Sequence, residues 1–192
     1  MRSAEFDREH VLRSAMAAFI AKGYSKTSMQ DLKKATGLHP GSIYCAFDNK
    51  RGLLLAALEQ YRSDRQAEFM TLFSSETSSL DALKRYLDNV VDECEREEIK
   101  DCLLQKALNE LTQQDEEVEN VITQMLNQWE EGIAAKIHQA QQDNELSSDR
   151  DHHQLAQFMV MGIYGIRTFS HTKPSEGTLQ NLADQLFEHI CA

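Results

Sequence analysis

Residues 27–53 read TSMQDLKKATGLHPGSIYCAFDNKRGL. Thr27 and Gln30 have the three-residue spacing of a capping box, which favours a helix start at this point. Gly37 can adopt the left-handed conformation that ends a helix, and Pro40 suits the first position of a new one. The stretch therefore predicts two short helices joined by a glycine turn.

The second of these helices has an apolar side and a polar side. Ile43 and Phe47 are four residues apart, so they face the same way and are expected to be buried. Small or polar groups remain on the tip or the outer side, namely His39, Gly41, Ser42, Tyr44 and Cys45. A helix-turn-helix lays such a second helix in the major groove of DNA, with its first residues against base edges. The pattern predicts a DNA-binding unit.

Apolar residues continue at helical spacing along the rest of the chain, and no run alternates as a strand would. The spacing predicts further helices over 12–23, 54–73, 80–94, 103–111, 115–142, 155–169 and 174–190. The predicted fold class is all-α, with about nine helices in total. We expect a three-helix DNA-binding domain over residues 1–55 and a helical bundle over residues 56–192.

Charge is distributed unevenly within a formal net charge of -11. Residues 1–65 carry 11 Lys/Arg against 7 Asp/Glu, whereas the remaining 127 residues carry 9 against 24. A basic head on an acidic body suits a DNA-binding module joined to a separate domain for sensing or dimerisation. An ordinary acidic protein with uneven charge would show the same sums, so charge alone leaves both interpretations open.

Several other kinds of site are disfavoured by the sequence. No segment approaches the roughly 18 apolar residues of a membrane span, and the N-terminus has no apolar signal region, so we expect a cytoplasmic protein without a membrane partner. The cysteines form no Cys-x-x-Cys pair. The adjacent His152 and His153 would point in different directions on a helix, and neither they nor the His189-x-Cys191 tail has a third ligand at useful spacing, so no metal site is predicted. Neither a cofactor-binding loop nor a catalytic motif occurs, so we expect no cofactor and no enzyme.

The head resembles the tetracycline-repressor (TetR) family of bacterial transcription regulators. The resemblance covers residues 10–58 and rests on these motifs: Gly23-Tyr24, Thr27-Ser28, Leu32, Ala35-x-Gly37, Gly41-Ser42-Ile43-Tyr44, Phe47-x-Asn49-Lys50 and Leu53-Leu54. Beyond about residue 60 only the layout of helices is similar. The family often has a glutamate where this chain has Gly52.

Carried onto matching positions, the resemblance implies that DNA phosphates are held by Thr27, Ser28, Tyr44 and Lys50, through hydroxyl groups, a phenol and an ammonium. Base contacts would then fall to His39, Pro40, Gly41, Ser42 and Cys45. Three alternatives remain open at this stage. Tyr44 could be a packing aromatic, Lys50 a solvated helix start, and His39 a helix cap.

The family also binds a small effector within its body and dimerises through its last two helices. The residues themselves favour a homodimer, because 155–169 is apolar almost all round and needs cover on both sides. Gly162 and Gly165 could admit a partner helix, or they could serve packing within one chain.

The effector site is predicted along the apolar stripes of the body. Its candidate lining residues are Tyr86, Cys94, Cys102, Leu104, Leu108, Met125, Trp129, Met161 and Tyr164. Each could equally be an ordinary core residue. Cys102 lies at a predicted helix start near Lys100 and Lys106, so a reactive sensor thiol and a buried inert cysteine are both open.

Together these patterns predict a homodimeric, ligand-responsive repressor bound to a near-palindromic operator of double-stranded DNA. Effector binding would change the separation of the two heads and so weaken binding to half-sites that lie about 34 Å, or a multiple of that distance, apart. The alternative is a DNA-bound architectural or assembly-controlling protein of the same shape that responds to no small ligand.

Overall fold

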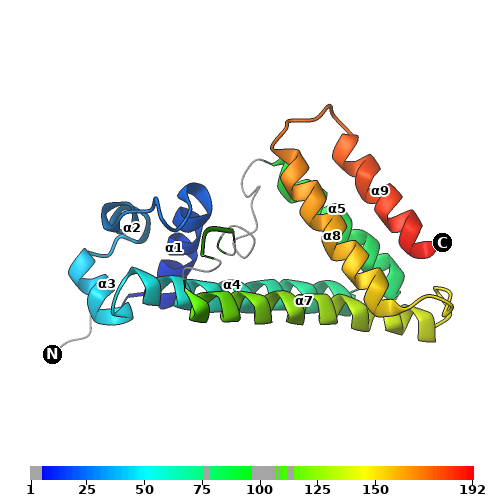
Figure 1. Cartoon of the computed structure of the whole chain (residues 1–192), viewed down its shortest axis with the longest axis horizontal. Coiled ribbons are helices and arrows are strands. Elements are labelled where there is room, and N and C mark those ends of the chain that lie inside the picture. The colour runs from blue at the N-terminus through cyan, green and yellow to red at the C-terminus, as the bar shows by residue number, and fades with distance from the viewer. Residues whose placement is uncertain (1–5, 76–77, 97–106, 108, 112–114) are drawn as a thin grey trace. The chain divides into compact units, whose positions relative to one another are not determined.

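The computed structural model of the protein describes residues 6–75, 78–96, 107, 109–111 and 115–192. The helices of Figure 1 are α1 (Arg8–Lys22), α2 (Met29–Thr36), α3 (Pro40–Phe47), α4 (Lys50–Ser75), α5 (Ser79–Glu95), α7 (Glu116–Gln142), α8 (His152–Ser170) and α9 (Thr178–Cys191). No strand occurs among the described residues, so the predicted all-α class is confirmed. None of the described helices combines the length and apolar composition that crossing a bilayer requires.

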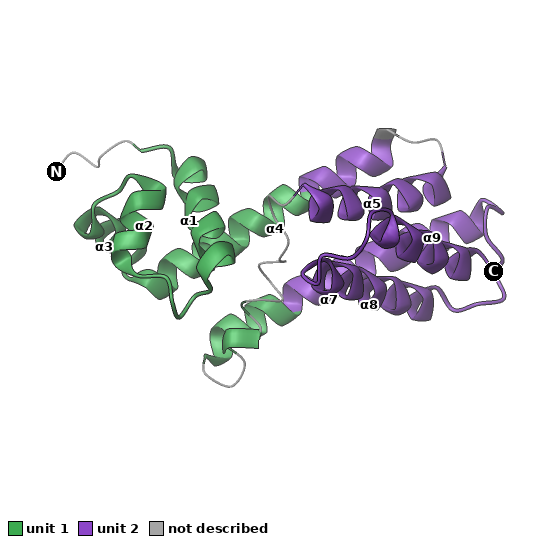
Figure 2. Cartoon of the chain, turned by 90° about the horizontal axis from the view of Figure 1, so that it is seen from above, with its two compact units in different colours: residues 1–66, 102–123 green, residues 67–101, 124–192 purple. Residues whose placement is uncertain are grey.

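The chain divides into two compact units, which Figure 2 colours separately. Unit 1 comprises residues 1–66 and 102–123, and unit 2 comprises residues 67–101 and 124–192. Helices α4 and α7 are each divided between the units, with one segment in unit 1 and the other in unit 2. The sequence predicted a boundary at residue 55, whereas the unit that contains α1 to α3 continues to Gln66 and takes in a later segment. The domain limits 1–55 and 56–192 stay a prediction.

Helix α1 is fixed at both ends by local hydrogen bonds. The Asp7 carboxylate accepts from the His10 amide at 3.1 Å and caps the first turn. At the other end Gly23 has a φ of 82°, and its amide donates to the Phe19 carbonyl at 2.8 Å. A positive φ suits glycine because no Cβ is present. The predicted end of this helix at Gly23 is confirmed.

Helix α2 is capped by Ser28 instead of Thr27. The Ser28 hydroxyl accepts from the Asp31 amide at 3.2 Å, while the Asp31 carboxylate accepts from the Ser28 amide at 2.9 Å. This is a complete capping box in which an aspartate takes the place usual for glutamate. The predicted pair of Thr27 and Gln30 is therefore wrong by one residue.

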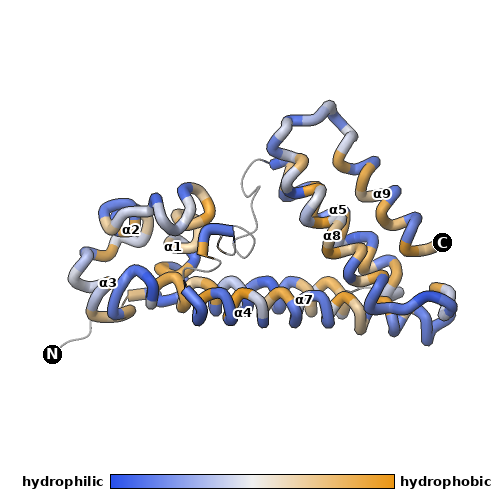
Figure 3. The backbone as a smooth tube through the Cα atoms, viewed as in Figure 1, coloured by the Kyte–Doolittle hydropathy of each residue, from blue (hydrophilic) through white to orange (hydrophobic). Residues whose placement is uncertain are grey.

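Unit 2 is built around one apolar core, formed by α5, α8, α9 and the second segment of α7. Helix α8 buries Leu155, Met159, Ile163 and Ile166 on its core side. Figure 3 shows apolar and polar segments alternating turn by turn along the helices, as expected for helices with one buried face. The predicted stripe of α7 is likewise buried at Val118, Ile122, Ile133 and Ile137.

The last helix begins later than the sequence predicted. We expected a start at Pro174, whereas α9 begins at Thr178 after Gly177, whose φ of 77° is left-handed. Because Gly177 interrupts helical geometry, the proline lies in the preceding turn.

The two glycines of α8 differ in their surroundings. Gly162 packs within the chain, since a Cβ there would lie 2.3 Å from Leu186 Cδ2 on α9. Gly165 is exposed, and a Cβ there would meet nothing within 4 Å.

Candidate nucleic-acid interface

The α2 and α3 pair forms the predicted helix-turn-helix. Gly37 ends α2 with a φ of 72°, and Pro40 is the first residue of α3. Ile43 is fully buried and Phe47 is 5% exposed, so one side of α3 is anchored in the core of unit 1. The amphipathic arrangement predicted from the sequence is confirmed, and it leaves the opposite side of α3 free to meet another surface.

The residues predicted to contact bases gather on that free side. His39, Gly41 and Cys45 are exposed, and Pro40 and Ser42 are half-buried. His39 precedes α3 at the cap position, but its side chain forms no capping hydrogen bond, so this structure gives no support to the capping alternative. Tyr44 is 50% exposed and is therefore no buried packing aromatic. The base-contacting role of these residues stays a prediction.

Thr27 requires a correction, because its side chain is turned into the protein. It is only 1% exposed, and its hydroxyl donates to the Gly23 carbonyl at 2.6 Å. A buried hydroxyl committed to the backbone cannot reach a phosphate without breaking that bond. Thr27 thus holds the turn between α1 and α2. Ser28 stays exposed, although its hydroxyl also donates to the Asp31 carboxylate at 2.6 Å.

Lys50 lies at the start of α4, against an aromatic ring of the α1–α2 turn. Its Nζ is 4.3 Å from the centroid of the Tyr24 ring, a cation–π contact. Burial lowers the pKa of Lys50 below its ordinary value, and the negative charge of Glu110 opposes that shift. Because the ring lies against the ammonium group, Lys50 is more than a freely solvated helix start.

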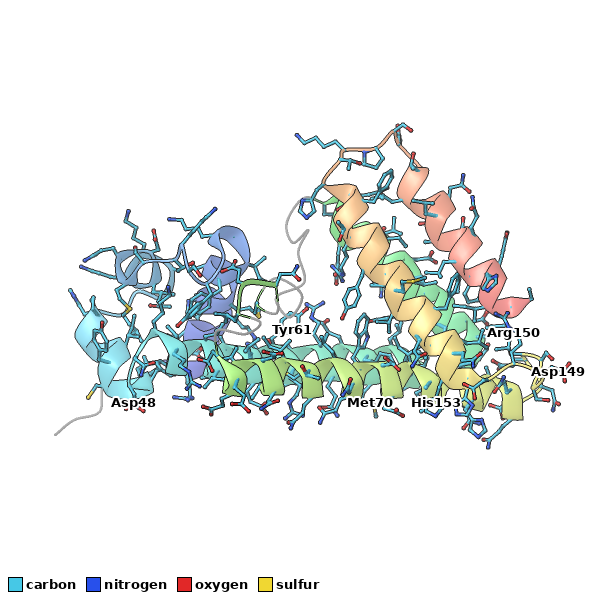
Figure 4. The ribbon with its side chains drawn as sticks, viewed as in Figure 1. Asp48, Tyr61, Met70, Asp149, Arg150 and His153 are labelled. Atoms are coloured by element: carbon cyan, nitrogen blue, oxygen red, sulfur yellow. The ribbon has the colours of Figure 1, made fainter. Side chains whose placement is uncertain are left out.

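The turn that carries α3 into α4 depends on backbone geometry that favours particular residues. Asp48, labelled in Figure 4, has a φ of 63°, and the Asn49 side chain accepts from the Gly52 amide at 2.9 Å to cap α4. A Cβ at position 52 would lie 2.0 Å from the Phe47 carbonyl oxygen. Glycine at position 52 therefore permits the close approach of two consecutive helices, which explains why a glutamate is absent here.

Ion pairs neutralise much of the positive charge of unit 1. Arg13 binds Asp64 at 2.8 Å, Lys22 binds Asp31 at 2.5 Å, Arg51 binds Glu117 at 2.6 Å and also pairs with Asp115, and Arg62 pairs with Glu59. Lys22 and Ser28 hold the pKa of Asp31 well below its usual range. Within the described part of unit 1, no ion pair involves Arg8, Lys26, Lys33, Lys34 or Lys50. These five cations are the ones available to an external anion.

An acidic side chain also braces the turn between α1 and α2. Glu110 accepts the Ser25 amide hydrogen at 3.0 Å, and its Oε1 lies 2.0 Å from where a Cβ of residue 23 would stand. The φ of residue 23 therefore favours glycine, and a Cβ there would in addition displace this carboxylate. The sequence motif marked Gly23 but gave no sign of its distant partner.

Of the predicted effector-binding residues, the structure brings three aromatic side chains of unit 2 together. The Trp129 indole donates to the Tyr86 hydroxyl at 2.8 Å, and the rings of Trp129 and Tyr164 meet edge-on at 5.6 Å. Phe69 joins them through an edge contact with Tyr86, also at 5.6 Å. Aromatic rings with one polar edge are common linings of small-molecule sites.

The other predicted effector-binding residues divide into three groups. Cys94 and Met125 are buried at 3% and 6% exposure. Met161 is 60% exposed on α8, so its assignment to an internal site is wrong for this single chain. The remaining three predictions, Cys102, Leu104 and Leu108, lie outside the described residues.

A polar hollow that the sequence did not predict lies where α7 passes into α8. Its volume is about 500 Å³, and its lining includes His138, His152, Asp149 and Arg150, of which the last two are labelled in Figure 4. The His138 and His152 rings are 4.6 Å apart, and neighbouring His153 is 4.4 Å from His152. Across the described residues, no group of three potential ligands has the geometry to hold a metal ion.

Two family models match the chain. The family model for bacterial regulatory proteins of the tetR family matches residues 11–57, and the model for the tetracyclin repressor-like C-terminal domain matches residues 79–185. The chain belongs to the TetR family. It is a DNA-binding transcriptional regulator with its helix-turn-helix in α2 and α3.

Individual TetR relatives match to different extents. The HTH-type transcriptional repressor ComR of Escherichia coli (strain K12) is 40% identical over 86 residues, which cover 44% of this chain and 41% of ComR. The uncharacterised HTH-type regulator YezE of Bacillus subtilis (strain 168) is 28% identical over 82% of both chains. The solved structure of CifR with a 26-bp operator DNA has a TM-score of 0.86 and 23% identity, covering 97% of this chain and 98% of CifR, which shows a shared fold.

Proposed function

We propose that this TetR-family regulator is a homodimeric repressor that a small molecule releases from a near-palindromic operator. The observation that carries the proposal is the exposed polar side of α3, which Ile43 and Phe47 anchor from behind. A rigid helix of this kind can present Ser42 and Cys45 to base edges while Tyr44 and Lys50 hold phosphates. ComR is a transcriptional repressor, which supports the direction of regulation.

Dimerisation is supported by apolar side chains left uncovered on α8 and α9. Met161 is 60% exposed, Phe169 is 42% exposed and Leu182 is 38% exposed. If these side chains form one contiguous surface, that surface is of the kind that marks a protein interface. Pairing through α8 and α9 would give two heads related by a twofold axis, matching the symmetry of a palindromic operator.

Effector binding is proposed at the aromatic cluster of Phe69, Tyr86, Trp129 and Tyr164. Their contacts connect α4, α5, α7 and α8, so a ligand inserted among them would change how these helices pack. A ligand that binds the native state must raise the melting temperature. A thermal-shift screen of metabolites should find such ligands and show that they weaken operator binding. Shifts that leave operator binding unchanged would favour the ligand-independent architectural alternative.

The DNA-binding part of the proposal is tested with two substitutions that should act differently. Lys50→Ala removes one cation per subunit, so the slope of log affinity against log salt should fall by about 1.8 for a dimer. When salt is raised from about 50 mM to about 200 mM, both proteins lose affinity for DNA. The factor by which the variant loses affinity should be about twelve times smaller than the factor for the wild type. Ser42→Ala should instead change base preference at one position of each half-site and leave the slope unaltered.

Fluorescence anisotropy with operator fragments selected from genomic DNA measures both effects. Lys136→Ala is the matched control, since Lys136 also makes a cation–π contact, 5.1 Å from the Phe73 ring centroid, but belongs to unit 2. Its slope should equal that of the wild type. Equal changes for Lys50→Ala and Ser42→Ala on every DNA sequence would refute the proposed division between phosphate and base contacts.

A further inference from the structure

Arg8 is a cation of unit 1 to which the proposed interface assigns no role. It is the first residue of α1, it is exposed, and no ion pair involves it within the described residues. Helix α3 carries the proposed base contacts, so the position of Arg8 relative to α3 decides whether this charge can reach DNA. The inference that follows rests on the proposed function of α3.

Arg8 is held against the last residue of α3. Its Cζ lies 4.8 Å from the centroid of the Phe47 ring, and the Phe6 ring is 6.3 Å from the same ring. The start of α1 and the end of α3 are therefore neighbours within one compact unit. A side chain fixed here travels with α3 when that helix docks.

Three carboxylates that adjoin Arg8 in the sequence or line the same hollow already have other partners. Asp7 accepts the His10 amide hydrogen, Glu9 binds Arg13 at 3.1 Å, and Glu59 pairs with Arg62. Glu59 also lines, together with Arg8, a hollow of about 290 Å³ between α1 and α4, so it is a potential rival to an external anion. Glu59 pairs with Arg62 within α4, and no ion pair joins it to Arg8 among the described residues.

We propose that Arg8, supported by the Phe47 ring, binds a backbone phosphate of the operator beside the end of α3. A guanidinium stacked on a ring has its orientation fixed, while its N–H donors at the edge stay free. Two of those donors match two oxygens of one phosphate, and such charge-assisted pairs are stronger than neutral hydrogen bonds. The contact fixes the register of the protein on DNA and carries no base preference.

The first test compares salt dependence among variants of the full-length protein. Arg8→Ala should lower the slope of log affinity against log salt by about 1.8 per dimer, on the operator and on unrelated duplex alike. Arg8→Lys should retain the slope, because the charge remains, but should bind less tightly because the fork is lost. The paired substitution Glu59→Gln with Arg62→Gln removes a neighbouring ion pair at constant net charge and should leave the slope unchanged.

The second test locates the phosphate. In a series of operators, one phosphate at a time is replaced by a neutral methylphosphonate. Wild-type protein should bind an operator less tightly when the replaced phosphate is one that it contacts. One position per half-site should weaken the wild type and have no effect on Arg8→Ala, because the partner of that phosphate is already gone. Such a position supports the proposal, and its absence overturns it.

Three further outcomes distinguish failure of the Arg8 contact from failure of the proposed DNA-binding face. If Arg8→Ala lowers the melting temperature but leaves the salt slope at the wild-type value, Arg8 only packs on Phe47 and the proposal is wrong. If Lys50→Ala lowers the slope while Arg8→Ala does not, the interface stands without Arg8. If neither variant lowers it, the proposed DNA-binding face itself fails, and the Arg8 contact fails with it.

Discussion

Gly23→Ala should destabilise unit 1 for two separable reasons. The backbone at Gly23 has a φ of 82° and a ψ of 156°, a region that is almost restricted to glycine. The added methyl group would also stand 2.0 Å from the Glu110 Oε1, so the carboxylate would have to move away. Glu110 would then lose its 3.0 Å hydrogen bond from the Ser25 amide.

The expected magnitude follows from these two effects. Holding a residue with a Cβ in such a conformation costs about 1 to 3 kcal/mol. Loss of the hydrogen bond to Glu110, which is exposed to solvent, costs about 1 kcal/mol more. Gly23→Ala should therefore reduce the free energy of unfolding by about 2 to 4 kcal/mol.

A double-mutant cycle with Glu110→Ala separates the two effects. With the carboxylate removed, the three atoms nearest to the methyl group are gone, so Gly23→Ala should cost mainly the backbone strain of about 1 to 3 kcal/mol. Urea unfolding followed by circular dichroism gives the four free energies, and amide exchange at Ser25 reports its hydrogen bond directly. If Gly23→Ala costs the same in both backgrounds within about 0.3 kcal/mol, Gly23 and Glu110 are not in contact and the reasoning is wrong.

Three more outcomes follow from contacts elsewhere. Arg51 lowers the pKa of Asp115 to about 2 from an ordinary 3.8. The pair therefore stabilises the fold above pH 3.8 and loses this effect as the pH falls towards 2. In Arg51→Gln, the free energy of unfolding should decrease less steeply than in the wild type over this range of pH. Trp129→Phe should cost about 1 kcal/mol in thermal denaturation by removing the bond to Tyr86, and it should cost less when Tyr86→Phe is already present; equal losses in both backgrounds would contradict that bond. Met161→Glu should convert the dimer to a monomer in light scattering at an unchanged circular dichroism spectrum, and a persisting dimer would exclude this face.

The helix-turn-helix could be predicted because its signals are local. Gly37 has a left-handed φ and Pro40 begins α3, as the sequence indicated, and both effects depend on the backbone of a single residue. The four-residue spacing of Ile43 and Phe47 fixed the buried side of α3 in the same way. Patterns of this kind depend little on the rest of the chain.

The cap of α2 shows where local signals become ambiguous. Thr27 and Ser28 are adjacent hydroxyl residues, and either could begin a helix. The choice depends on the turn that precedes them, since the Thr27 hydroxyl donates to the Gly23 carbonyl and leaves Ser28 as the cap. The resemblance to a family could not resolve this either, because it assigned both hydroxyl groups to phosphates.

Helix α8 shows a second kind of ambiguity. Its residues are apolar almost all round, so periodicity cannot tell the side that meets its own chain from the side left for a partner. Met161 was predicted to line an internal site and is instead 60% exposed, whereas Met159 and Val160 are buried at 0% and 9% exposure. Only the packing of α5 and α9 distinguishes these neighbours.

The structure adds most to the sequence in its account of charge, because it shows which cations are already paired with carboxylates. The count of basic residues favours DNA binding only weakly, but the ion pairs of the structure show which cations can act. Arg51 is next to Lys50 in the sequence, yet Arg51 is held by Asp115 and Glu117 while no described ion pair involves Lys50. Those two carboxylates come from the start of α7, more than sixty residues away in the chain. The positive charge that this head can offer to phosphate therefore depends on distant acidic residues as well as on its own lysines and arginines. Replacing both carboxylates, Asp115→Asn together with Glu117→Gln, should free Arg51 and raise the salt slope of DNA binding.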